Sequence, residues 1–230
     1  GLVNELAYRD QIYGDLEERF GDAEFVPMSR YIRRDQPVGW SATAAFGTKV
    51  ALIYGVGAVV RGEGGYDPIF GGVSMGSEAV ARAFREAIDD DDVDAILFRV
   101  SSPGGSYVAS DTIWRETLRA REAGKPVIVS MGDVAASGGY FVAMAADAIV
   151  AQPATITGSI GVYGGKLITR GLWGKAGITF DAVSVGDNAA IWSSNHDFDD
   201  GEWERIEASL DRIYEDFTGK VAEGHALTRE

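Results

Sequence analysis

Residues 95–105 (AILFRVSSPGG) and 126–139 (PVIVSMGDVAASGG) follow the same plan. Each begins with a short apolar run, typical of a strand that is buried on both faces, and each ends in paired glycines. Helical patterns over residues 77–88 and 107–123 accompany these strands. Strands that alternate with helices predict an α/β domain with largely parallel pairing and right-handed crossovers.

The rest of the chain extends this pattern. Further strands are expected where short apolar runs recur, over residues 50–60, 148–151 and 178–185. Further helices are expected over residues 138–146 and 166–176, and the glycine-dense stretch 62–72 is expected to be a loop. An amphipathic helix of about five turns is predicted near the end from apolar residues at three- and four-residue steps: Trp203, Ile206, Leu210, Ile213, Phe217 and Val221.

Residues 1–48 differ from the rest of the chain in composition and in hydrophobic pattern. Residues 13–34 are charged and weakly patterned, and residues 35–48 (DQPVGWSATAAFGT) have the small-residue composition of a linker. We therefore expect one domain over residues 49–230, preceded by a junction.

Composition excludes several kinds of site. The chain of 230 residues has no cysteine and two histidines, and its formal net charge is −14. Disulfides, thiolate zinc sites, cysteine nucleophiles and histidine-rich metal sites are excluded, and no cofactor or metal is expected. The acidic balance argues against nucleic acid as a partner and is most simply explained by solubility. The acidic runs at 89–92 and 197–202 are interpreted as solvated.

Ser137 is the candidate nucleophile. It follows a predicted strand and a turn and precedes a predicted helix, which is the context of a nucleophile elbow, although Ala135 stands where that motif has glycine. The simpler interpretation makes Ser137 a helix N-cap and the paired glycines turn residues. Two such junctions on successive strands, about 34 residues apart, favour a site at the carboxyl edge of the sheet.

The base for such a serine is not evident from the residues. His225 is expected at a solvated helix end, and His196 lies in a loop. A lysine can serve as the base when burial keeps its amine neutral. None of the lysines stands out by its surroundings; they are Lys49, Lys125, Lys166, Lys175 and Lys220.

Three segments in this order, AILFRVSSPGGS, KPVIVSMGDVAASGGYFVAMAAD and ATITGSIGVYGG, resemble the signal peptide peptidase A (protease IV) family of serine–lysine peptidases. The resemblance covers residues 50–230 and implies a ClpP/crotonase fold. It implies that Ser137 is the nucleophile and that backbone N–H groups of Gly104 or Gly105 and of Gly138 form the oxyanion hole.

The resemblance also carries expectations about the biological setting. The family degrades signal peptides after their release and prefers apolar side chains in its binding grooves. Its members are usually anchored in the cytoplasmic membrane, face the periplasm or exterior, and assemble into bowl-shaped oligomers. We therefore expect a peptide substrate, a homo-oligomer, and membrane contact through an anchor outside this chain.

One position departs from the family pattern. Short members carry the catalytic lysine near the position that Ala189 occupies here. Either the chain is the serine-bearing second half of a long, two-repeat member whose first half supplies the lysine, or Ala189 is an engineered replacement. The opening GLVNEL, similar to the end of a family repeat, favours the first explanation. The chain alone is then expected to be inactive and cut at both ends.

Two other functions are compatible with the pattern. A crotonase-type acyl-CoA enzyme would use the glycine N–H groups on a thioester without needing Ser137. A catalytically inert scaffold repeat would need neither, although the intact ASGGY segment at 136–140 argues against it.

Overall fold

The computed structural model describes residues 5–6, 18–21, 24–27, 48–67 and 72–224. Its contacts divide the chain into two compact units. The first comprises Gly1–Ile160 with Phe217–Glu230, and the second is Gly161–Asp216. Within the described ranges, no helix combines the length and the apolar character that crossing a membrane requires.

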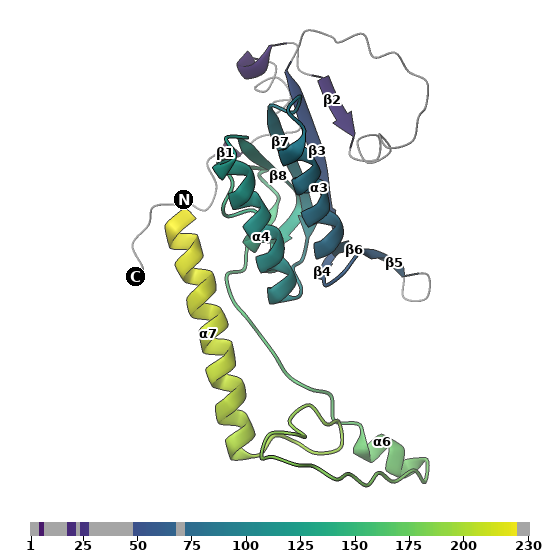
Figure 1. Cartoon of the computed structure of the whole chain (residues 1–230). Coiled ribbons are helices and arrows are strands. Elements are labelled where there is room, and N and C mark those ends of the chain that lie inside the picture. Colours follow the sequence, from purple (N-terminus) through teal and green to yellow (C-terminus); the bar gives the residue numbers. More distant parts are fainter. Residues whose placement is uncertain (1–4, 7–17, 22–23, 28–47, 68–71, 225–230) are drawn as a thin grey trace. The chain divides into compact units, whose positions relative to one another are not determined.

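A seven-stranded parallel sheet forms the centre of the first unit (Figure 1). Its order is β1-β9-β8-β7-β3-β2, with β10 paired to β8, and every pairing is parallel. The strands are β1 (Glu5–Leu6), β2 (Glu24–Pro27), β3 (Lys49–Val56), β7 (Ala95–Ser102), β8 (Val127–Ala136), β9 (Ala148–Ala151) and β10 (Ile156–Gly158). The expected α/β class with parallel strands is confirmed.

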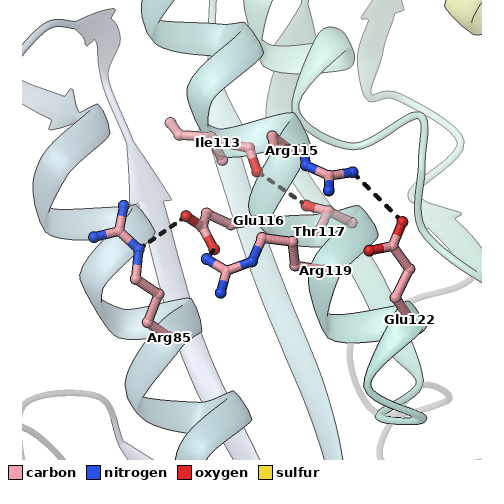
Figure 2. Close-up of polar contacts among 7 residues, drawn as sticks. All are labelled: Arg85, Ile113, Arg115, Glu116, Thr117, Arg119 and Glu122. Carbon is pink, nitrogen blue, oxygen red and sulfur yellow. Dashed lines mark hydrogen bonds and ion pairs between the residues drawn. The ribbon is translucent and has the colours of Figure 1, made fainter.

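Helices α3 (Ser77–Asp89) and α4 (Tyr107–Glu122) cover one face of this sheet, within a residue or so of their predicted bounds (Figure 1). Apolar side chains at helical spacing on α3 are buried, and Phe84 meets Phe98 of β7 edge-on at 5.2 Å. The Ser106 side chain caps α4 by accepting a hydrogen bond from the Ala109 N–H. Between the two helices, the buried Glu116 is paired with two arginines (Figure 2).

A second, three-stranded sheet in the order β4-β6-β5 lies beside the end of β3. It is formed by β4 (Ala58–Val60), β5 (Gly64–Asp67) and β6 (Gly72–Gly76). The expectation of a plain loop over residues 62–72 is therefore wrong for β5, because pairing with β6 overrides the low strand propensity of its glycines. Gly57 separates β3 from β4 with φ 85°, and an added Cβ would lie 1.6 Å from the Val73 O.

The second unit contains two helices, α6 (Arg170–Lys175) and the first part of α7 (Asp200–Gly224). The predicted helix 166–176 is thus only six residues long. The predicted strand 178–185 is wrong, because no described strand pairs with it and its valines are almost fully exposed. α7 is longer than predicted. The side chain of Asp199 and that of Glu202 cap its first turn reciprocally.

The junction at residues 1–48 remains a prediction. β1 and β2 join the central sheet beside β9 and β3. The proposed linker, apart from Thr48, lies outside the described residues, as does His225.

Candidate active site

Strands β7 and β8 bring the two glycine-containing junctions to the same edge of the sheet. They run parallel, and Val100 of β7 pairs with Met131 of β8. Further along, Ser102 pairs with Ala135, so two steps along β7 match four along β8. This β-bulge places the end of β7 beside Ser137, which follows β8 directly.

Ser137 occupies a strained backbone conformation. Its φ of 51° and ψ of −121° lie in a region that non-glycine residues rarely adopt. Its N–H donates to the Gly158 O at 2.9 Å, and its carbonyl accepts from the N–H groups of Tyr140 and Phe141. Its side chain makes no capping hydrogen bond. Ser137 thus occupies the N-cap position of the short helix at 138–141, as the simpler interpretation expected, but its side chain does not cap that helix.

The predicted glycines surround Ser137 at distances that exclude side chains. A Cβ built on Gly104 would lie 2.7 Å from the Gly138 N and 2.9 Å from the Ser137 Cβ. A Cβ built on Gly138 would lie 3.0 Å from the Gly105 N. The structure thus brings together all four residues that the sequence singled out at the two junctions. Backbone N–H groups beside a serine hydroxyl are the arrangement that stabilises the oxyanion of acyl transfer.

The segment after Ser137 is more compact than the sequence predicted. The expected helix 138–146 is reduced to α5 (Gly138–Phe141), followed by turns. Phe141 packs against Tyr107, Trp114 and Phe217, with ring centroids 4.8 to 6.3 Å apart. Burial raises the pKa of Tyr140 to about 12, so this side chain is neutral at ordinary pH. The segment that follows Ser137 is therefore buried against a cluster of aromatic side chains.

Ser159 is a residue that the sequence did not single out. It is exposed, its φ is 48°, and it follows Gly158, the residue whose carbonyl accepts the Ser137 N–H. Ser137 and Ser159 are the non-glycine residues with positive φ in the described chain. Strain of this kind depends on how β10 pairs with β8, and a sequence pattern does not reveal it.

All lysines lie among the described residues, and those of the first unit have partners other than Ser137. Lys49 pairs with Asp92 at 2.6 Å, and the amine of Lys125 donates to backbone carbonyls at the end of α3. Lys49 begins β3 and Lys125 lies just before β8, so both are at the edge of the sheet opposite Ser137. Lys220 pairs with Asp111 at 2.6 Å and lies over Trp114.

Other candidates fall in the second unit. The Lys166 amine is buried there, 4.0 Å from Glu202 and 4.2 Å from the centre of the Phe198 ring. His196 is half-exposed, with its Nδ1 3.8 Å from Glu202. Ala189, at the position nearest the lysine of short family members, is exposed in a turn. Across the described ranges, no cluster of three or more His, Asp or Glu side chains could hold a metal ion.

A family profile and several curated proteins match the chain. The sequence profile of "Peptidase family S49" matches residues 119–230. The chain is 34% identical over 226 residues to "Serine protease SPPA, chloroplastic" of Arabidopsis thaliana, covering 96% of this chain and 33% of that protein. It is 38% identical over 229 residues to "Protease 4" of Salmonella typhi, covering 100% of this chain and 36% of that protein.

The chain therefore spans about a third of the length of these two relatives. Among solved structures, a ClpP1 point mutant from Listeria monocytogenes matches with a TM-score of 0.40 and 14% identity. That match covers 77% of this chain and 73% of the other.

Proposed function

Because this chain belongs to peptidase family S49, whose fold is ClpP/crotonase-like, we propose that it carries the nucleophile of a serine endopeptidase that cleaves apolar peptides. The observation that carries the proposal is the elbow at Ser137. There, the backbone of Ser137 is strained and its hydroxyl makes no capping hydrogen bond. The backbones of glycines from two turns lie close to it.

The proposed reaction is acyl transfer. A base takes the Ser137 proton as Oγ attacks a peptide carbonyl, and the N–H groups of Gly138 and of the 104–105 turn hold the oxyanion. The protonated base then donates to the leaving amine as the C–N bond breaks. A water molecule, deprotonated by the same base, hydrolyses the acyl-enzyme and restores Ser137.

The base in this proposal is a lysine supplied by another part of a longer protein. Three observations support it. The lysines of the first unit are bonded elsewhere, and the position nearest the lysine of short members is Ala189. The relatives are about three times as long as the stretch they share with this chain, which leaves room for a second repeat.

The proposal extends to the substrate and its setting. Released signal peptides are the proposed substrates, processed by a homo-oligomer at the cytoplasmic membrane with its catalytic part facing the periplasm or exterior. These points derive from the family resemblance of the three sequence motifs.

Replacing the nucleophile tests the proposal directly. In the full-length protein, Ser137→Ala is expected to reduce cleavage of an apolar peptide by at least about 10³-fold. A serine-directed phosphonate is expected to label the unmodified protein at Ser137. Cleavage retained by Ser137→Ala would rule the assignment out, and an unlabelled Ser137 would favour the acyl-CoA alternative.

A further inference from the structure

The turn between β7 and α4 leaves one backbone N–H without an acceptor among the described residues. Its proline has no N–H. The Gly104 N–H donates to the Ser102 Oγ at 3.2 Å, and the Ser106 N–H donates to the Val59 O at 2.8 Å. The remaining donor of the turn is the Gly105 N–H. Gly104 is therefore not the free donor, and Gly105 is the one available to an oxyanion.

The direction of this donor is fixed through its own peptide group. The Gly104 carbonyl and the Gly105 N–H belong to one planar trans peptide, so they point in opposite directions. The carbonyl accepts a hydrogen bond from the Val59 N–H of β4 at 2.9 Å. The Gly105 N–H consequently points away from β4. A Cβ built on Gly138, next to Ser137, would lie 3.0 Å from the Gly105 nitrogen.

Ser102 restrains the peptide group between Pro103 and Gly104, which precedes the one that carries the Gly105 N–H. Its side chain is fully buried at the end of β7, and its Oγ is the acceptor of the Gly104 N–H. Without that oxygen, the N–H would be buried without a partner, which is costly. Gly104 and Gly105, at φ 99° and 155°, have little intrinsic resistance to backbone rotation. Without the Ser102 oxygen, the turn could therefore rotate until the Gly104 N–H meets another acceptor.

We propose that Ser102 is a positioning residue for catalysis, whose side-chain oxygen holds the turn so that the Gly105 N–H is aimed at the oxyanion formed at Ser137. The inference rests on the proposed peptidase function. Ser102 does not touch the substrate; it acts through the Gly104 peptide.

Two variants of the full-length protein separate hydrogen bonding from packing. Ser102→Ala removes the acceptor, whereas Ser102→Cys fills nearly the same space with a much weaker one. For both, kcat for an apolar peptide is expected to fall about 10- to 100-fold, with KM within about twofold. Affinity for a peptide aldehyde, which forms an oxyanion adduct with serine, should fall by the same factor as kcat.

Ser130→Ala is the matched control. Ser130 is also a buried serine, in the neighbouring strand β8, and its Oγ accepts a hydrogen bond from Arg99 at 2.8 Å. This variant is expected to lose thermal stability while keeping its kcat per folded molecule. Values of kcat within twofold of the unmodified protein for both Ser102 variants would overturn the inference, as would a loss no larger than that of Ser130→Ala.

The Ser137→Ala variant distinguishes failure of the positioning role of Ser102 from failure of the proposed function. If Ser137→Ala is inactive and the Ser102 variants are normal, only the positioning role is lost. If Ser137→Ala still cleaves, or if the unmodified protein cleaves no peptide, the proposed function fails and the positioning role with it.

Discussion

The backbone of Gly138 lies so close to the neighbouring turn that the site requires its lack of a side chain. A Cβ at this position would lie 2.6 Å from the Ser110 Oγ, 3.0 Å from the Gly105 N and 3.2 Å from the Gly104 Cα. Its backbone conformation does not itself demand glycine, because its φ is not positive. The requirement comes from the close approach of two loops, which also brings their N–H groups together.

Gly138→Ala should therefore damage activity more than folding. The added methyl group would lie 2.6 Å from the Ser110 Oγ and 3.0 Å from the Gly105 nitrogen, so the Ser110 side chain and the 104–105 turn must both give way. A displacement of the turn by about 1 Å would cost about 100-fold in rate. Overpacking of this kind is expected to lower the free energy of unfolding by about 1–3 kcal/mol. Peptide cleavage and chemical denaturation of the full-length variant measure the two effects.

Gly161→Ala serves as the control for this change. A Cβ built on Gly161 has nothing within 4 Å, and this glycine does not have a positive φ. Both activity and stability are expected to stay near those of the unmodified protein. Unimpaired cleavage by Gly138→Ala would mean that the two loops do not need to meet for the reaction.

At the scale of elements, the pair of helices that precedes and follows β7 is held together by a buried carboxylate (Figure 2). Glu116 of α4 is 6% exposed at its side chain, whereas Arg85 of α3 and Arg119 of α4 are 46% and 45% exposed. Each arginine contacts a different carboxylate oxygen at 2.8 Å. The carboxylate therefore depends on the arginines, while the arginines retain contact with water.

This asymmetry predicts strong coupling between the two arginines. Arg85→Ala or Arg119→Ala alone leaves Glu116 one cationic partner and is expected to cost about 1 kcal/mol or less. The double variant leaves a buried charge unpaired and is expected to cost about 3–5 kcal/mol. Urea denaturation of the singles and the double gives the coupling free energy.

A third substitution checks the cause of that coupling. Adding Glu116→Gln to the double variant removes the unpaired charge and should restore part of the lost stability. If the stability losses of the two single variants add up to that of the double variant, or if Glu116→Gln restores no stability, the carboxylate of Glu116 does not depend on the two arginines as the structure indicates.

The elements also show where sequence patterns were informative. Helices α3 and α4 were predicted closely because tertiary packing and local periodicity agree over 13 and 16 residues. The stretches 138–146 and 178–185 were mispredicted. Alanine content favours a helix in the first, but a crowded elbow leaves room for a single turn. Apolar residues favour a strand in the second, but a strand also needs a partner.

At the scale of the whole molecule, the sequence indicated a candidate nucleophile and its neighbouring glycines, but it indicated no base. Ser137 and the glycines lie within two short motifs at the ends of adjacent parallel strands, so local pattern and topology were sufficient to bring them together. The hydrogen bond from the Gly104 N–H to the Ser102 Oγ spans only two residues, so it is a local serine turn that the sequence analysis did not single out. The strain at Ser159 accompanies the pairing of β10 with β8 and leaves no local pattern. The proposed base, supplied by another part of a longer protein, would leave no pattern in this stretch.

The engagement of the lysines leads to a prediction about the 230-residue chain on its own. Lys49 and Lys125 lie at the far edge of the central sheet, and Lys220 is bound to Asp111 on α4. A serine with no neutral amine beside it is a weak nucleophile. The purified chain, confirmed as folded by circular dichroism, is therefore expected to show no turnover of an apolar peptide above the level of its Ser137→Ala variant. Turnover that Ser137→Ala abolishes would instead assign the base to the chain itself, and the lysine responsible could then be found by replacing Lys166 and Lys175 of the second unit in turn.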